Sequence, residues 1–274
     1  MSWSSGKDST LALHEVRSAG EIEVIGLLTT VNASFERVAM HGVRRVLLEA
    51  QAAALGLPLH VVELPWPCTN PVYERLMSEA IDAARQRDVS RMVFGDLFLA
   101  DIRAYREASL AGTGMSPVFP LWQRPTAGLA REILASGIRA VLACVDPAQA
   151  PRDIAGRWYD EELLRTLPDS VDPCGENGEF HTFVTDGPGF ARPLDVTIGA
   201  TVERDGFVFT DVLPASRPLR ATTARREARC RPGARPAAAQ GDPWRTNTHR
   251  REFVAHGSPW TRPRSADDQG EDAA

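Results

Sequence analysis

The chain has 274 residues, which is enough for one large domain or two small ones. Its composition is 43% hydrophobic and 24% charged, with a formal net charge of −5, as is ordinary for a soluble globular protein. No apolar run approaches the roughly 18 residues of a membrane span, and no secretory signal stands out, so we expect a cytoplasmic protein with no membrane contact.

Segments that favour a helix alternate with segments that favour a strand over the first 145 residues. Amphipathic stretches predict helices over residues 8–19, 43–55, 72–87, 101–111 and 126–136. Short apolar runs between them predict strands over residues 23–31, 57–64, 91–95 and 139–145. The alternation predicts an α/β fold with a parallel sheet that has helices on both faces and binds ligands at the carboxyl ends of its strands.

The pattern weakens after residue 146. We expect a short helix over residues 158–167, a polar loop over 173–182 and a β-hairpin over 195–211 with its turn at Asp205-Gly206. Beyond about residue 214 the chain is rich in Arg, Pro and Ala, which predicts a disordered tail. Residues 216–274 carry a net charge of +5, which leaves −10 for the body. An acidic body argues against general nucleic-acid binding there.

The only lysine of the chain lies in a short string near its start, whereas arginine occurs 30 times. The string consists of Ser4, Ser5, Gly6, Lys7, Asp8 and Ser9. Small residues let the backbone approach a ligand, the N–H groups at a helix start favour an anion, and a lysine adds a mobile positive charge. The string therefore predicts a phosphate-binding loop. It is not a Walker A loop, because Asp8 follows the lysine and only one glycine is present.

A phosphate loop of this kind should follow a strand, but only residues 1–3 precede it. A strand usually needs about five residues. We therefore expect either a very short first strand or a start codon upstream of Met1, and we favour the second explanation.

A second candidate string follows the predicted strand at residues 91–95. Asp96 at that strand end suits Mg²⁺ or a ribose hydroxyl. Arg103 and Arg106 are three residues apart on one predicted helix face, with Glu107 beside them, where they are placed to clamp a phosphate or carboxylate. A solvated helix face explains the same residues equally well.

Two further strings carry imidazole, amide and carboxylate groups. The first is AMHG, with His41 and Gly42, although an ordinary loop before a helix would also account for it. The second, GENGEFHT, places Glu176, Asn177, Glu179 and His181 around two glycines. Titratable groups are rarely so concentrated in a structural loop and are typical of reactive sites, the alternative being a polar turn. Nothing marks the neighbouring Cys174 as activated, and we expect it to be structural.

Together these strings resemble the diphthine–ammonia ligase family of PP-loop ATP pyrophosphatases. The loop is close to the SGGKDS pattern, with Ser5 in place of a glycine, and GENGEFHT is the more specific match. The resemblance covers residues 1–214. It implies an adenine nucleotide alpha-hydrolase-like fold (Rossmann-like, HUP-type) with an ATP-binding domain over residues 1–145. A small substrate and catalytic region would follow over 146–214, before the tail over 215–274.

The chemistry that the resemblance implies is AMP-forming amidation. ATP would adenylate a substrate carboxylate and release pyrophosphate, and ammonia would then attack the acyl-adenylate. The implied cofactors are ATP and Mg²⁺. The acceptor is diphthine on elongation factor two in the best-known members of the family, and an unidentified carboxylate here. The sequence leaves the oligomeric state open, a homodimer included.

The resemblance also implies roles for the candidate residues. Residues 4–9 would cradle the β,γ-phosphates, with Lys7 neutralising the leaving pyrophosphate. Asp8 and Asp96 would hold Mg²⁺. Nucleotide binding would also involve Thr29, Thr30 and Asp96, and substrate binding His41, Gly42, Arg103, Arg106 and Glu107. The acceptor side would consist of Glu176, Asn177, Glu179 and His181. Within it, His181 or Glu179 would take the proton from the attacking ammonium.

Two other readings of the sequence remain open. A different PP-loop reaction, such as tRNA modification, would need an RNA-binding surface or a pair of thiols. The body is acidic and the cysteines are scattered without CxxC spacing, so only the basic tail favours that reading. A nucleotide-binding module without chemistry would have no need for GENGEFHT.

Overall fold

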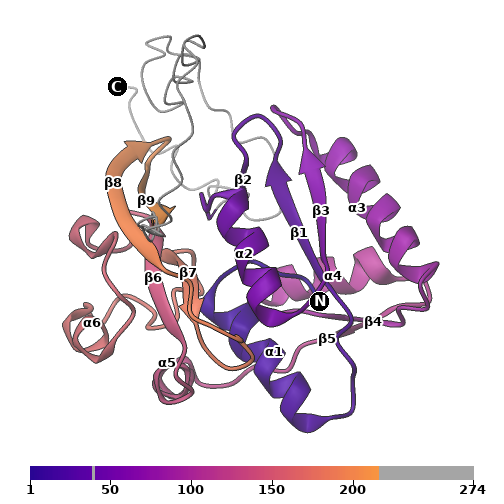
Figure 1. Ribbon diagram of the computed structural model, residues 1–274, viewed down its shortest axis with the longest axis horizontal. Coiled ribbons are helices and arrows are strands. Elements are labelled where there is room, and N and C mark those ends of the chain that lie inside the picture. The colour runs from indigo at the N-terminus through magenta and orange to yellow at the C-terminus, as the bar shows by residue number, and fades with distance from the viewer. Residues whose placement is uncertain (39–40, 216–274) are drawn as a thin grey trace, which may run out of the picture.

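The computed structural model describes residues 1–38 and 41–215 (Figure 1). Ala39 and Met40 of the AMHG string and residues 216–274 of the predicted tail lie outside the described residues. The first half of the chain forms a three-stranded and a two-stranded sheet, which are mainly parallel, and the second half forms a four-stranded antiparallel sheet. The α/β class predicted from the sequence is confirmed.

All six predicted helices are present. They are α1 (Lys7–Ala19), α2 (Arg45–Leu55), α3 (Asn70–Arg85), α4 (Ala100–Leu110), α5 (Thr126–Ala135) and α6 (Glu161–Thr166), with a 3-10 turn at Arg152–Ile154. α1 and α2 end at Gly20 and Gly56, as expected. α6 begins three residues later than predicted because the Asp160 carboxylate accepts a hydrogen bond from Leu163 N (2.8 Å) and caps the helix there.

The parallel sheet is built around β1 (Leu27–Asn32), which pairs in parallel with β3 (Leu59–Leu64). β4 (Arg91–Val93) pairs in parallel with β5 (Ser116–Val118), and β2 (Arg37–Val38) runs antiparallel to the end of β1. Residues 1–3 lie between the two groups, because Trp3 N donates to Leu28 O (2.8 Å) and Ser2 N donates to Val93 O (2.9 Å). Ser2 makes an isolated parallel bridge with Leu28 just before the predicted phosphate loop, and a start codon upstream of Met1 stays a prediction.

The antiparallel sheet corrects one prediction. Its order is β7-β6-β9-β8, with β6 (Arg139–Val145), β7 (Phe180–Asp186), β8 (Val196–Arg204) and β9 (Phe207–Pro214). β6 was expected to belong to the parallel sheet but runs antiparallel to both of its neighbours. A strand buried on both faces has no alternating pattern that would distinguish the two cases. The hairpin at Asp205-Gly206 is confirmed, whereas β7 begins inside the expected polar loop, at Phe180.

The largest buried cluster among the described residues connects the sheet around β1 with the antiparallel sheet. It extends from Trp3 and Leu13 near the phosphate loop to Phe183 on β7 and Val212 on β9. α1 packs against β7, and α2 packs against β9. The antiparallel sheet takes strands from both sides of residue 145, and a domain division there stays a prediction.

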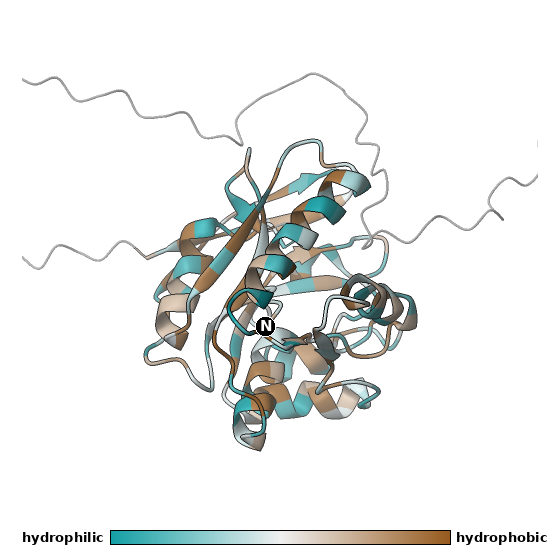
Figure 2. Ribbon diagram, turned by 90° about the vertical axis from the view of Figure 1, so that its right-hand side faces the viewer, coloured by the Kyte–Doolittle hydropathy of each residue, from teal (hydrophilic) through white to brown (hydrophobic). Residues whose placement is uncertain are grey.

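The helices in Figure 2 carry alternating hydrophilic and hydrophobic bands, as expected for helices that cover a sheet. None of the helices within residues 1–38 and 41–215 is long and apolar enough to cross a membrane.

Candidate active site

The phosphate loop contains a strained residue at the position where the resemblance expects glycine. Ser5 has a φ of 68°, the left-handed region that favours glycine. It is fully buried, and its Oγ has no hydrogen-bond partner among the described residues. The surroundings hold the backbone there, because Ser5 O accepts hydrogen bonds from Val184 N (3.0 Å) and Gln51 Nε2 (3.1 Å). The loop therefore keeps the glycine conformation without a glycine.

The carboxyl end of β4 packs directly on the first turn of α1. A Cβ added to Gly95 would lie 3.0 Å from both the carbonyl carbon of Asp8 and the nitrogen of Ser9. Only a glycine allows this approach, which brings Asp96 close to the phosphate loop. The role of Gly95 as a packing residue was not predicted, because the sequence shows only that it precedes Asp96.

Lys7 is buried between the two halves of the chain, with 2% of its side chain exposed. Its ammonium donates to both carboxylate oxygens of Asp8 (3.0 and 2.9 Å) and to the carbonyl of Cys174, and its backbone N–H donates to Thr182 Oγ1 (3.1 Å). Burial lowers the pKa of Lys7, but the charges around it, that of Asp8 above all, more than compensate and raise it. Lys7 is therefore a charged group fixed in the interior.

Glu176 ties the GENGEFHT loop to the end of β4. Its Oε1 accepts hydrogen bonds from Leu97 N (2.8 Å) and Phe98 N (3.3 Å). Burial and the nearby charges of Asp8 and Asp96 raise the pKa of Glu176 to about 8, although the two N–H groups act in the opposite direction. A carboxyl group with such a pKa changes its charge close to neutral pH, as a catalytic acid or base requires.

Asp8 and Asp96 share this environment. Burial raises the pKa of Asp8, although the charge of Lys7 acts in the opposite direction. Burial also raises the pKa of Asp96 against the effect of Arg106, whose Nε lies 3.6 Å from Asp96 Oδ2. Asp96 Oδ2 is buried and has no hydrogen-bond partner among the described residues. A divalent cation would relieve this concentration of negative charge.

The described carboxylates fit a Mg²⁺ site that the protein shares with a bound nucleotide. Within the described ranges there is no group of three or more His, Cys, Asp or Glu side chains arranged to hold a metal ion. Mg²⁺ is usually bound by one or two carboxylates together with substrate phosphates and water. Asp8 and Asp96 therefore fit an ion that arrives with a nucleotide rather than a resident metal.

Glu179 and Asn177 form the interior of the GENGEFHT loop. Glu179 is 2% exposed, and its Oε1 accepts hydrogen bonds from Asn177 Nδ2 and from Asp172 N, each at 3.0 Å. A Cβ on Gly175 would lie 2.8 Å from Phe180 O, so the first glycine of the motif allows the loop to close on β7.

Asp172 was missed by the sequence reasoning. Its Oδ1 accepts hydrogen bonds from Cys174 N (2.8 Å) and Glu176 N (3.3 Å) and so shapes the turn that begins the motif. The Asp-Pro pair just before the first glycine was a turn signal that could have indicated it.

His41 and His181 meet across the site although they are far apart in the sequence. Their ring centroids are 4.4 Å apart. Burial and the charge of Lys7 lower the pKa of His181 to about 4, and burial, His181 and Lys7 lower the pKa of His41 well below its usual value. Both imidazoles are therefore neutral at neutral pH.

The loop that carries His41 is anchored to β9. Asp211 accepts hydrogen bonds from Arg37 Nη1 and Nη2 (3.1 Å each) and from Arg44 Nε (2.9 Å), and Arg37 Nη1 also donates to Gly42 O (2.7 Å). Nothing in the sequence indicated this cluster, because Asp211 lies 174 residues from Arg37 and 167 residues from Arg44. Gly42 therefore lies in a loop that hydrogen bonds through Arg37 connect to β9.

The two arginines of α4 have different surroundings. Arg106 is buried beside Asp96, with its guanidinium 4.8 Å from the ring centroid of Phe94. Arg103 donates to Glu107 Oε1 (2.7 Å) and stacks on aromatic rings, among them that of Trp122 at 4.7 Å. Arg106 is the one that lies near the acidic cluster, while Arg103 and Glu107 form an ion pair on the helix surface.

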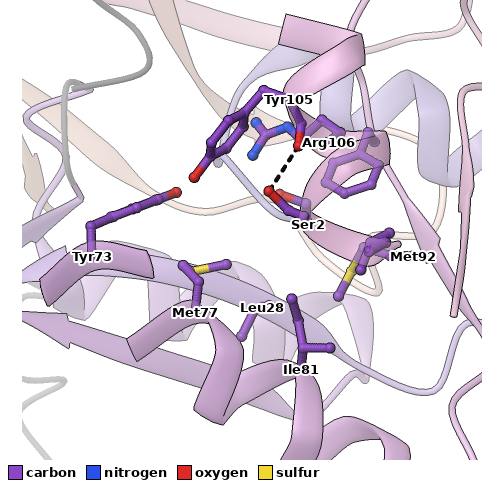
Figure 3. A pocket seen from close by; sticks show the side chains of 11 residues that line it. Ser2, Leu28, Tyr73, Met77, Ile81, Met92, Tyr105 and Arg106 are labelled. Carbon is purple, nitrogen blue, oxygen red and sulfur yellow. Dashed lines mark hydrogen bonds between the residues drawn. The ribbon is translucent and has the colours of Figure 1, made fainter. Parts of the chain in front are cut away.

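A small cavity lies between the parallel sheet and helices α3 and α4 (Figure 3). Figure 3 shows Tyr73, Tyr105 and Arg106 at one end and Met77, Leu28, Ile81 and Met92 at the other. Its volume of about 40 Å³ has room for about three water molecules. Its lining is mainly apolar and aromatic.

The two threonines of β1 lie behind the phosphate loop. Thr29 Oγ1 donates to Trp3 O (2.6 Å), directly before the loop begins. Thr30 is half-buried beside it and lies opposite Val62 of β3. Thr29 thus supports the loop, and contact of either residue with adenine stays a prediction.

Known protein families match both halves of the chain. Models described as the diphthamide synthase N-terminal and C-terminal domains match residues 1–116 and 126–211. A diphthine–ammonia ligase from Danio rerio is 26% identical over 230 residues, which are 76% of this chain and 90% of that protein. Bos taurus and Rattus norvegicus proteins of the same name are 24% identical over 234 residues and 26% over 180. These alignments cover 76% and 60% of this chain, and 86% and 67% of the two relatives.

Proposed function

Because the chain belongs to the diphthamide synthase family of ATP-dependent ligases, we propose that it is a carboxylate–ammonia ligase of the diphthine–ammonia ligase type. It would adenylate a carboxylate with ATP, release pyrophosphate, and let ammonia attack the adenylate to give an amide and AMP. Diphthine on elongation factor two is the first acceptor to test, since the relatives are named for diphthine. A cytoplasmic location is part of the same proposal.

The observation that carries this proposal is the contact between the phosphate loop and the GENGEFHT loop. The side chain of Lys7 donates to the Cys174 carbonyl and its backbone N–H to Thr182 Oγ1 (3.1 Å), over 160 residues away in the sequence. An adenylating enzyme must bring the acceptor carboxylate to the α-phosphate of ATP. Two motifs in direct contact supply the two sides of such a site.

The phosphates would bind at the start of α1. The N–H groups of its first turn and the helix dipole favour an anion there, and the charge of Lys7 would offset the charge that develops on pyrophosphate. Asp8 and Asp96 would hold Mg²⁺ together with phosphate oxygens, and the ion would supply further charge neutralisation there.

Glu176 is the best candidate for the base that takes a proton from ammonium, so that ammonia can attack the adenylate. Burial and neighbouring carboxylates raise its pKa to about 8, which suits a base near neutral pH. Burial lowers the pKa of His181 to about 4, so its imidazole is a poor proton acceptor. Glu179 is held by two donors inside the loop, where it would support the acceptor side. Neutral His41 and His181 would line the site as hydrogen-bonding groups.

A thiol-dependent PP-loop reaction is less well supported. Burial raises the pKa of both Cys144 and Cys174 to about 12, which leaves neither thiol activated. A module that only binds nucleotide would not account for a buried carboxyl group with a pKa near neutrality beside the phosphate loop.

The test is to incubate the protein with ATP, Mg²⁺, ammonium and a panel of carboxylates that includes diphthine on elongation factor two, and to follow AMP and pyrophosphate. Acceptor-dependent formation of both products supports the proposal. Glu176→Gln should abolish amide formation, whereas Glu161→Gln on the exposed surface of α6 should not. Formation of ADP, or binding of ATP without turnover across the panel, would refute the ligase assignment.

A further inference from the structure

The ammonium of Lys7 has no free hydrogen-bond donor in this structure. Its three N–H groups match three acceptors, the two carboxylate oxygens of Asp8 (3.0 and 2.9 Å) and the carbonyl of Cys174. A lysine in this state can donate to a phosphate only after it gives up one of these bonds. The other groups around the ammonium determine whether it keeps its position when that bond is lost.

Two aromatic rings complete the enclosure of Lys7. Its Nζ lies 5.5 Å from the ring centroid of Tyr159 and 5.5 Å from that of Phe180, within the range of cation–π attraction. The two ring centroids are 6.3 Å apart. Both residues are almost completely buried, and both come from the second half of the chain. We call Tyr159, Phe180 and the Cys174 carbonyl the lysine cage.

The cage is held rigidly by its own contacts. Tyr159 Oη donates to Pro173 O (2.7 Å), directly before Cys174, and Tyr159 N donates to Ala140 O on β6 (2.8 Å). Phe180 is the first residue of β7. The rings are therefore anchored to the antiparallel sheet and to the loop that provides the carbonyl acceptor.

The hydrogen bond from Lys7 to Asp8 is the one that can be exchanged for a bond to phosphate. The side chain of Asp8 is 26% exposed, whereas the cage is buried, and Asp8 is also the carboxylate closest in sequence to the phosphate-binding N–H groups. A ring attracts a cation without offering a lone pair that competes with a phosphate oxygen. The cage therefore holds the ammonium in place and leaves its charge available.

We propose that Tyr159 and Phe180 are positioning residues that fix the Lys7 ammonium, so that it turns one N–H from Asp8 to the pyrophosphate of ATP without leaving its place. The proposal rests on the proposed ATP-dependent function. It also explains why a chain with 30 arginines retains one lysine at this point. The enclosure fits a compact ammonium, whereas a planar guanidinium is larger and needs a different set of acceptors.

The single lysine makes a direct test possible. Trinitrobenzenesulfonate labels amines, and peptide mass mapping separates Lys7 from the amino group of Met1. Without nucleotide, Tyr159→Leu should label at Lys7 at least about tenfold faster than the wild type, because the cation–π contact of a buried ammonium is lost. Tyr159→Phe keeps the ring and should label much more slowly than Tyr159→Leu. Phe183→Leu removes a buried ring from the same strand as Phe180 and is the matched control.

Two labelling results would overturn the cage. One is a rate for Tyr159→Leu equal to that of the wild type. The other is equal acceleration in Phe183→Leu, which would trace the effect to general loosening of the core. These measurements need no turnover, so they decide the cage even if the wild type forms no AMP and the proposed function fails.

Kinetics then test the link to catalysis. In an enzyme that forms AMP, Tyr159→Leu should lower kcat with little change in the KM for ATP, because the interaction with leaving pyrophosphate develops in the transition state. Tyr159→Phe should recover most of the rate. An unchanged kcat in Tyr159→Leu, or a change in KM alone, would show that the rings do not position Lys7 for the reaction.

Discussion

Replacing Ser5 with glycine should stabilise the protein, although glycine usually weakens a folded structure. Ser5 has a φ of 68°, is fully buried and leaves its Oγ without a partner among the described residues. A non-glycine residue in the left-handed region costs about 1–2 kcal/mol, and an unsatisfied buried hydroxyl costs about 1 kcal/mol or more. The greater freedom of glycine in the unfolded chain offsets about 0.5–1 kcal/mol. The expected net gain is about 1–2 kcal/mol.

Ser5→Ala separates the two contributions, because it removes the hydroxyl and keeps the Cβ. Thermal unfolding followed by circular dichroism should rank Ser5→Gly above Ser5→Ala, and Ser5→Ala at or above the wild type. For a domain of this size the gain corresponds to a rise in Tm of about 3–6 °C in Ser5→Gly. If Ser5→Gly is no more stable than Ser5→Ala, the backbone strain assigned to this residue is wrong.

Three further predictions concern the same site. The raised pKa of Glu176, about 8, means that the folded state binds a proton more tightly than the unfolded state, so its contribution to stability is lost as pH rises from about 5 through 8. Glu176→Gln should flatten this part of the pH profile in urea unfolding, and an unchanged profile would contradict the assignment. Lys7→Arg should reduce AMP formation at least about tenfold despite its retained charge, and wild-type turnover would exclude Lys7 from the mechanism. Gly95→Ala should destabilise the protein by about 1–3 kcal/mol because its Cβ would meet the backbone of Asp8 at 3.0 Å. Gly128→Ala, whose Cβ would meet nothing within 4 Å, is its control in the same unfolding assay.

Local signals in the sequence were enough to predict the helices. Gly20 and Gly56 follow apolar-periodic stretches and end α1 and α2, because helix caps depend on neighbouring residues alone. The lone Lys7 among small residues indicated an anion site at a helix start, and GENGEFHT indicated a reactive loop. The hairpin at Asp205-Gly206 was also predictable, since its turn is specified by two residues.

Strand pairing was the part of the fold that local signals did not specify. β6 is apolar on both faces, and such a run fits a parallel or an antiparallel neighbour equally well. One of its two neighbours, β7, begins within a polar motif, so no run of strand-forming residues marked the start of that strand. Which neighbour β6 takes depends on the burial of the whole apolar surface, to which distant segments contribute.

The sequence by itself determined the ends of the helices and indicated the groups that we propose act on ATP, because loop composition, helix starts and titratable clusters are local properties. Only the tertiary structure decided how those groups are held. It placed the ring of His41 against that of His181, raised the pKa of Glu176 by burial among carboxylates, and enclosed Lys7 between Tyr159 and Phe180. Tyr159 carries no motif, and its contact spans 152 positions in the numbering of the chain. Burial, dielectric environment and ring contacts depend on the packing of remote segments, so they exist only in the folded chain.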